Sequence, residues 1–104
     1  MKWEVKYAES ALQDLFDIDD YISIVLLEPD TAKEQVGRIM DAAESLGEMP
    51  FRYSLYDKGK WKDSGIRFLP IDNYIILYLP DENNTIVKIV RILYSGRNIE
   101  QLDS

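Results

Sequence analysis

Apolar and charged residues alternate at the start of the chain. Trp3, Val5 and Tyr7 are separated by lysine and glutamate side chains. A period of two is typical of a strand with one covered face, so we expect a strand over residues 2–7.

After Tyr7, apolar residues recur every three or four positions. This period predicts a helix that begins at about residue 8–10 and ends at about residue 26. Ser10 and Gln13 have the spacing of a capping box, although a start at Ala8 fits equally well. Four carboxylates lie mostly between the apolar positions, and we expect them on the solvent face, where helical geometry keeps them from converging on a metal ion. These carboxylates are Asp14, Asp17, Asp19 and Asp20.

The segment around Pro29 ends this pattern, because proline disfavours helix in the residue before it. Asp30 is a good N-cap residue, so we expect a second helix to begin there, with Gly47 as its C-cap. The apolar stripe of this helix consists of Ala32, Val36, Ile39, Met40, Ala43 and Leu46. The connection between the two helices is short, which predicts an antiparallel hairpin.

Residues 48–64 show no sustained period, and we expect a long irregular connection there. From Ile66 the pattern indicates strands over residues 66–71, 73–79 and 85–94, with a turn at Asp72-Asn73. Three successive strands joined by tight turns favour an antiparallel meander. Residues 99–104 read as a polar tail.

Both faces of the segment 73–79 are apolar, since Tyr74, Ile76 and Tyr78 alternate with Ile75, Leu77 and Leu79. One face has to pack on the helices, and we expect the other to stay half exposed as a docking surface with arginines at its rim. The predicted fold is α+β, a single domain over residues 1–104. In it a two-helix hairpin packs on a curved antiparallel sheet of about four strands, in the order β-α-α-β-β-β.

The composition removes many kinds of chemistry. The 104 residues include no histidine and no cysteine, so neither a histidine-based triad nor a thiolate metal site can be built from this chain alone. We expect no metal and no cofactor. No run reaches the roughly 20 apolar residues that span a bilayer, and residues 1–7 lack the apolar stretch of a signal peptide. We therefore expect a cytoplasmic protein without a membrane partner.

The formal net charge of −7 is unevenly distributed along the chain. Residues 1–50 hold 4 Lys/Arg against 12 Asp/Glu, whereas residues 51–104 hold 8 against 7. Any surface that faces phosphate is therefore expected in the second half. Lys58, Lys60 and Lys62 around Trp61 are candidates for a small nucleic-acid contact. A solvated loop is the alternative for them.

Five short stretches in this order resemble a known family. They are residues 11–15 and 18–22 in the first helix, 65–67 before the meander, 73–78 in its centre, and Arg91-Ile92-Leu93-Tyr94-Ser95-Gly96-Arg97-Asn98 at its end. Together they are similar to the RelE/ParE superfamily, the toxins of type II toxin–antitoxin modules, also called plasmid stabilisation proteins. The resemblance covers roughly residues 3–102. It implies a cognate antitoxin that wraps the sheet and the helical hairpin and forms a hetero-oligomer with the toxin.

The resemblance leaves two branches open for the target. In the RelE-like branch the toxin is a ribosome-dependent mRNA endonuclease (mRNA interferase), and Arg67, Arg91, Arg97 and Tyr94 would be its catalytic residues. In the ParE-like branch the toxin inhibits DNA gyrase by binding it. The ribonuclease branch commonly has a further arginine in the strand that is here 74–78, and more often a histidine where this chain has Tyr94. These departures favour the ParE-like branch, and a detoxified binding module of the same fold is a third alternative.

Each arginine also has a structural interpretation. Arg67 has the alternative of pairing with a surface carboxylate. Arg91 alternates with apolar residues, which favours a half-buried arginine paired with an Asp or Glu. Arg97 follows the last strand, where a solvated side chain is the simplest account.

Overall fold

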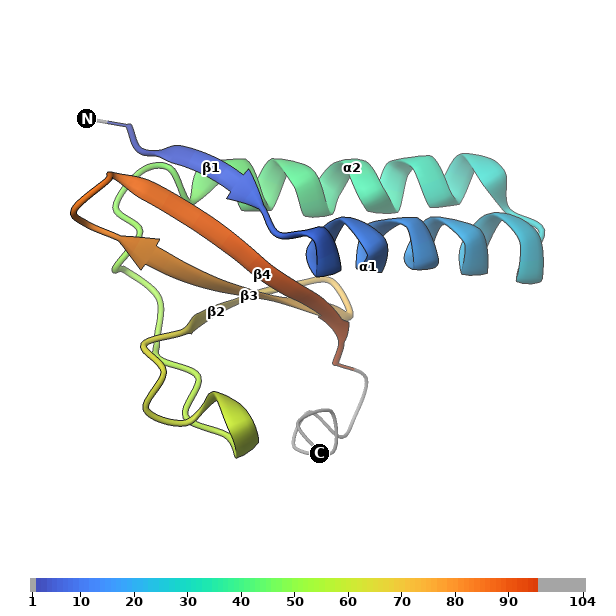
Figure 1. The fold of residues 1–104 in the computed structure, drawn as a ribbon. Helices are drawn as coiled ribbons and strands as arrows, with labels where there is room; N and C mark the ends of the chain where they lie inside the picture. The colour runs from blue at the N-terminus through green and yellow to red at the C-terminus, as the bar shows by residue number, and fades with distance from the viewer. Residues whose placement is uncertain (1, 96–104) are drawn as a thin grey trace.

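The computed structural model describes residues 2–95 of the chain. Two helices lie side by side and cover one face of a four-stranded sheet (Figure 1). This arrangement confirms the predicted α+β fold and the order β-α-α-β-β-β. The elements are β1 (Glu4–Tyr7), α1 (Glu9–Asp20), the π-helical turn η1 (Tyr21–Val25), α2 (Pro29–Ser45), the 3₁₀ turn η2 (Gly59–Trp61), β2 (Arg67–Ile71), β3 (Tyr74–Asp81) and β4 (Ile86–Tyr94).

The sheet is mixed, with strand order β1-β4-β3-β2. The predicted antiparallel meander is confirmed for β2, β3 and β4. The expectation of an antiparallel sheet is wrong for β1, which is parallel to β4 with Glu4 opposite Ile86 and Tyr7 opposite Ile89. The reason is the connection. A parallel pair needs a long crossover, and both helices and the meander separate β1 from β4 in the chain.

The main core lies between the hairpin and the sheet. Ala11 and Leu15 of α1 and Ile39 and Ala43 of α2 are buried against Ile76 of β3 and the other inward-facing strand residues. Most of each predicted stripe thus faces the sheet, and Met40 is an exception with 44% exposure. The alanines let the helices approach the strands closely because they add little volume.

The second face of the sheet is covered by the chain itself. Ile75 and Leu77 are 1% and 0% exposed, and they form a second cluster with Tyr56 and Ile66. The segment before β2 is bonded to the outer edge of that strand, since Phe68 N–H donates to Ser54 C=O at 3.1 Å and Tyr56 N–H donates to Ile66 C=O at 2.8 Å. The expectation of a half-exposed apolar sheet face is therefore wrong for Ile75 and Leu77, whereas Leu79, Val90 and Leu93 are only partly buried.

The helix ends differ slightly from those expected. α2 begins at Pro29, with Glu28 at the N-cap position, so Asp30 lies in the first turn and is not the cap. Proline fits the first helical position because its missing N–H would have no partner there. The C-cap is Leu46, one residue before Gly47. Gly47 has another role, because a Cβ at this position would come within 2.7 Å of the Trp3 carbonyl oxygen.

The turn between β2 and β3 is fixed to α2. Asp72 has a φ of 54°, a left-handed conformation that aspartate tolerates better than most residues. Its Oδ2 accepts hydrogen bonds from Arg38 Nε and Gln35 Nε2, both at 2.9 Å. These bonds, that of Arg38 first, lower the pKa of Asp72. Within residues 2–95, no helix has the length and apolar character needed to cross a membrane.

Candidate functional site

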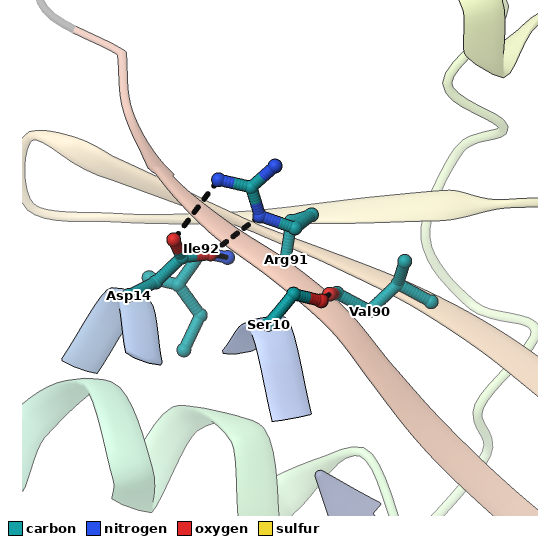
Figure 2. Close-up of polar contacts among 5 residues, drawn as sticks. All are labelled: Ser10, Asp14, Val90, Arg91 and Ile92. Atoms are coloured by element: carbon teal, nitrogen blue, oxygen red, sulfur yellow. Dashed lines mark hydrogen bonds and ion pairs between the residues drawn. The ribbon is translucent and has the colours of Figure 1, made fainter. Parts of the chain in front are cut away.

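The guanidinium of Arg91 is bonded to Asp14 of α1 (Figure 2). Arg91 Nε donates to Asp14 Oδ2 at 2.7 Å, and Nη2 donates to Oδ1 at 2.9 Å. The side chain of Asp14 is 11% exposed, so its expected place on the solvent face of the helix is wrong. A two-bond arginine–carboxylate pair fixes both partners more firmly than a single contact does.

This pair lies at the edge of β4. β1 ends at Tyr7, which is opposite Ile89, and α1 takes the place of a neighbouring strand from there on. Ser10 Oγ donates to Val90 C=O at 2.9 Å, and Ile92 N–H donates to Asp14 Oδ2 at 2.9 Å (Figure 2). Side chains of α1 thus satisfy main-chain groups that an open strand edge would leave to solvent. Ser10 bonds to the strand and does not cap the helix.

The electrostatics agree with a structural role for Arg91. The hydrogen bond to Asp14 raises the pKa of the guanidinium. Its positive charge is balanced by Asp14 across two short bonds. A phosphate that approached Arg91 would have to compete with this carboxylate. Arg91 therefore has the structural role that the sequence favoured, in a half-buried ion pair with Asp14.

Arg67 of β2 is also bonded within the chain. Its Nη1 donates to the carbonyls of Tyr53 at 2.5 Å and Phe51 at 3.2 Å, and its guanidinium lies over the Phe51 ring with 5.1 Å to the centroid. These contacts attach residues 51–53 to the sheet. The partners of Arg67 are thus two main-chain carbonyls and an aromatic ring. The sequence had suggested a surface carboxylate as its structural partner.

Two of the candidate catalytic residues, Arg67 and Arg91, are not brought together in the described part of the chain. Arg67 is opposite Tyr78 and Arg91 is opposite Leu77. Because neighbouring residues of a strand point to opposite faces, these two positions belong to different faces of the sheet. Arg97 lies outside the described residues.

Tyr94 is at the end of β4 and its side chain is 59% exposed. Its ring packs edge to face against Tyr74, with 5.6 Å between the centroids. Burial, followed by electrostatic interactions with Tyr94 and Tyr21, raises the pKa of Tyr74. Neither tyrosine has a bond to Arg67 or Arg91 among the contacts of residues 2–95.

The lysine-rich loop covers the second face of the sheet. Trp61 packs against the cluster of Tyr56, Ile75 and Leu77, and Lys60 Nζ lies over its ring at 5.0 Å. The indole is thus held in the fold and is not a free stacking platform. The sheet also carries two exposed lysines that the sequence did not single out as a pair. They are Lys6 of β1 and Lys88 of β4, which lie directly opposite each other. The alternating pattern of residues 2–7 already placed Lys6 on the outer face.

The hairpin carries an apolar groove on the side away from the sheet. A cavity of about 380 Å³ lies between α1 and α2, and its lining consists of Leu12, Leu15, Phe16, Asp19, Lys33, Val36 and Met40. Phe16 is 63% exposed, and Leu12 and Met40 are also exposed. The sequence contained a signal for this groove, because Leu12 and Phe16 are four residues apart beside the core stripe of α1.

The end of the hairpin is apolar as well. η1 and the following residues expose Tyr21, Ile24, Val25, Leu26 and Leu27. Leu27 has a φ of 56°, which is uncommon for a bulky residue. An exposed apolar surface of this kind is typical of a protein–protein contact.

A second cavity, of about 440 Å³, has a charged lining. Its residues are Lys2, Asp41, Glu44, Ser45, Glu48 and Arg52. Arg52 donates to the Glu48 carbonyl, and Lys2 lies 3.9 Å from Glu44. Within the described residues, no group of three or more carboxylates is arranged to hold a metal ion.

Comparison with known proteins identifies similar chains. The family model described as the ParE toxin of the type II toxin–antitoxin system, parDE, matches residues 5–99. None of the curated protein sequences matches the chain. The fold is similar to a structure of the chromosomal ParDE toxin–antitoxin system from P. aeruginosa, with a TM-score of 0.72, 20% identity, and coverage of 89% of this chain and 96% of that one.

Two further structures have the same fold. One is the toxin–antitoxin complex RelBE2 from Mycobacterium tuberculosis, with a TM-score of 0.66, 19% identity, and coverage of 90% of this chain and 92% of that one. The other is the archaeal RelE–RelB complex from Pyrococcus horikoshii, with a TM-score of 0.59, 16% identity, and coverage of 93% and 99%. At these identities the similarity concerns the fold.

Proposed function

This chain belongs to the ParE toxins of type II toxin–antitoxin systems, and we propose that it acts by binding a protein target, DNA gyrase, and is neutralised by a cognate antitoxin. The observation that carries the choice of a binding toxin over a nuclease is the bonding of the strand arginines. Arg91 is paired with Asp14, and Arg67 is bonded to main-chain carbonyls. A nuclease needs cations that are free to stabilise the charge on a reacting phosphate.

The shape of the sheet supports the same choice. Ile75 and Leu77 are covered by the segment that contains Tyr56 and Trp61, so this part of the sheet is core and not an open cleft. β3 contains no lysine or arginine. In residues 2–95, the sheet therefore presents no converging set of cations near the exposed Tyr94.

The antitoxin contact is supported by the hairpin. The exposed side chains of Leu12, Phe16 and Met40 line a groove that the chain itself leaves open. The structures of similar fold from M. tuberculosis and P. horikoshii are complexes of a toxin with its antitoxin. A partner that covers this groove would remove apolar surface from water, which is the main driving force of such an association.

The target is tested with purified components. DNA gyrase is incubated with relaxed plasmid, ATP and increasing amounts of this chain, and supercoiling is followed on an agarose gel. We expect supercoiling to stop when the chain is in excess, and to return when a cognate antitoxin, sought in the product of the gene that adjoins this one (the neighbouring gene), is added first. Heat-unfolded chain is the control. Full supercoiling with folded chain in excess would count against gyrase as the target.

The nuclease alternative is tested with Tyr94→Phe. This variant removes one exposed hydroxyl and keeps the edge-to-face contact with Tyr74, so the fold is retained. We expect cells that express Tyr94→Phe to stop growing as they do with the wild type, and mRNA ends mapped during arrest to show no new cleavage. Loss of toxicity in Tyr94→Phe together with new mRNA ends in the wild type would favour the nuclease.

A detoxified binding module is distinguished from an active toxin by expressing the chain in cells and following growth. If the wild-type chain is harmless at high expression, but still forms a complex with the product of the neighbouring gene, the binding role remains and the toxic role is lost. Growth arrest that the neighbouring gene relieves is the result we expect.

A further inference from the structure

The turn at the end of the hairpin exposes apolar side chains that contribute little to the core. In residues 21–27, which we call the apolar tip, Ile22 is 7% exposed and is the side chain that packs the segment into the fold. The lining of the groove between α1 and α2 includes no residue of the tip. The remaining large apolar side chains of the tip are 50% to 80% exposed, and they are Tyr21, Ile24, Val25, Leu26 and Leu27.

The main chain of the tip is bonded within itself. Leu26 N–H donates to Tyr21 C=O at 3.1 Å, which closes the wide turn of η1, and Glu28 N–H donates to Ile22 C=O at 3.0 Å. Turns of this π-helical kind are frequent at functional sites. Because the segment has its shape before any partner arrives, binding through it does not require the entropy cost of ordering a loop.

Leu27 has an unfavourable conformation within the tip. It is 80% exposed and has a φ of 56°, and in this left-handed region the Cβ of a leucine crowds the following carbonyl oxygen. The free chain thus gains little burial from Leu27 and is destabilised by its backbone, whereas asparagine tolerates the same conformation. A large apolar residue at such a position indicates a use outside the free chain.

The charge around the tip defines the chemistry of its partner. Nucleic acid and anionic lipid are both negatively charged, so carboxylates around an apolar surface repel them. A second copy of the chain would bring two acidic surfaces together, which disfavours self-association through the tip. Residues 17–30 contain no lysine or arginine, and their five carboxylates, which we call the acidic collar, are Asp17, Asp19, Asp20, Glu28 and Asp30.

We propose that the apolar tip is the surface by which this toxin binds its target protein, and that it enters an apolar pocket rimmed by lysine or arginine. The inference rests on the proposed function, in which the toxin acts by binding a protein, and it specifies the contact. Tyr21 and the aliphatic side chains form the centre of the interface, because aromatic anchors in desolvated pockets carry much of the binding energy. The acidic collar forms the rim, where opposite charge on the partner speeds association and fixes the orientation.

Leu27→Asn tests the apolar part of the contact, and Met49→Asn is its matched control. Met49 is 73% exposed and has a φ of 49°, so it is similar to Leu27 in exposure and backbone, but it follows α2 at the other end of the hairpin. We expect Leu27→Asn to raise the Tm of the free chain by about 4 °C, because asparagine relieves the backbone. It should need about 10-fold more protein for half-inhibition of gyrase supercoiling, whereas Met49→Asn inhibits like the wild type.

Asp20→Lys tests the charge of the acidic collar. Asp20 is exposed at the C-terminal end of α1, where a lysine agrees with the helix dipole, so the variant folds. The control Glu82→Lys makes the same change of charge in the turn between β3 and β4, away from the end of the hairpin (Figure 1). We expect inhibition to weaken about 5-fold in Asp20→Lys and to stay at the wild-type level in Glu82→Lys. Wild-type inhibition by Asp20→Lys would overturn the cationic rim.

Growth arrest without antitoxin and calorimetric binding of the cognate antitoxin complete the test. We expect Leu27→Asn to lose growth arrest and to bind the antitoxin as the wild type does, because the tip and the groove are separate surfaces. Full arrest by Leu27→Asn would overturn the inference, and so would weaker antitoxin binding with toxicity retained, or an equal loss of toxicity in Met49→Asn.

Failure of the proposed function gives a different pattern. If the wild type arrests growth without inhibiting gyrase, and Leu27→Asn loses the arrest, gyrase is the wrong target and the tip remains the target-binding surface. If the wild type inhibits gyrase and Leu27→Asn inhibits it equally well, the proposed function holds and the tip is not the contact. A wild-type chain that neither arrests growth nor inhibits gyrase would overturn both.

Discussion

The sheet and the hairpin differ in how their conspicuous residues are used. On the sheet, two of the arginines that suggested a phosphate site, Arg67 and Arg91, are held by the carbonyls of residues 51 and 53 and by Asp14. On the hairpin, Phe16 and Leu27 are 63% and 80% exposed. Arg67 and Arg91 are thus committed to the fold, whereas large apolar side chains of the hairpin are left to solvent.

This difference shows which kind of residue carries information about function. A cation on a strand is costly to leave without a partner in a half-buried place, so the fold supplies one. An exposed apolar side chain contributes little to folding, and a cluster of them is retained for another reason. We therefore expect the docking surface of this chain on the helices, whereas Arg91 of the sheet helps to hold α1 in place.

The largest expected effect is that of Asp14→Ala. The change removes two bonds to Arg91 and one to the Ile92 amide, and it leaves a half-buried guanidinium without its carboxylate. We expect the free energy of unfolding to fall by about 3 kcal/mol, measured by urea denaturation. Asp17→Ala, on the exposed side of the same helix, is the matched control, with a change of about 0.5 kcal/mol or less. Equal losses of stability in the two variants would show that the bonds between Asp14 and β4 do not stabilise the fold.

Tyr78 gives a pH-dependent test of the sheet. Burial raises its pKa to about 12, and its hydroxyl donates to the Pro50 carbonyl at 2.7 Å. The folded state favours the neutral phenol, so its contribution is complete below the unfolded pKa of about 10 and is lost as pH rises through about 12. The free energy of unfolding should fall by about 2–3 kcal/mol as this stabilisation is lost.

Tyr78→Phe lowers stability at neutral pH by about 1 kcal/mol through the lost hydrogen bond, but it removes this part of the alkaline decline. Unfolding free energies measured from neutral to alkaline pH check the result. Thr31→Ser, which changes an exposed residue without a titratable side chain, is the control and should keep the shape of the wild-type alkaline profile. Identical alkaline profiles for Tyr78→Phe and the wild type would contradict the prediction.

Arg67→Ala has a smaller expected effect. The variant loses the bonds to the Tyr53 and Phe51 carbonyls and the contact with the Phe51 ring. We expect a loss of about 1–2 kcal/mol and faster proteolysis within residues 48–56. Arg67→Lys keeps the charge but not the fork of donors, so it should recover only part of the loss. A variant as stable as the wild type would return Arg67 to the candidates for target binding.

The sequence was sufficient for the order of the elements. The change from a period of two to a period of three or four marks the end of β1, and Pro29 and the Asp72 turn mark later boundaries. These are local signals. The direction of β1 was not a local property, since it depends on the long path through the hairpin to β4.

The partners of the side chains were less accessible from the sequence. Asp14 lies in an acidic run and resembles its solvated neighbours in sequence, but β1 is too short to cover the edge of β4 and Asp14 is the carboxylate that reaches this edge. The covered second face has a similar cause. The aromatic residues of the irregular segment, Tyr56 and Trp61, had no period that would have shown where they pack.

The smallest effect on stability is expected for Phe16→Ser on the hairpin. The ring is 63% exposed, so its removal gives up little buried area, and the free energy of unfolding should stay within about 0.5 kcal/mol of the wild type. Its neighbour Leu15 is 6% exposed, and Leu15→Ala should cost about 2–4 kcal/mol as the matched control. Binding of the neighbouring gene's product should fall in Phe16→Ser by about 10-fold or more, since the ring is a wall of the groove. If Phe16→Ser unfolds as readily as Leu15→Ala, the groove is part of the core, and the contrast between a closed sheet and an open hairpin does not hold.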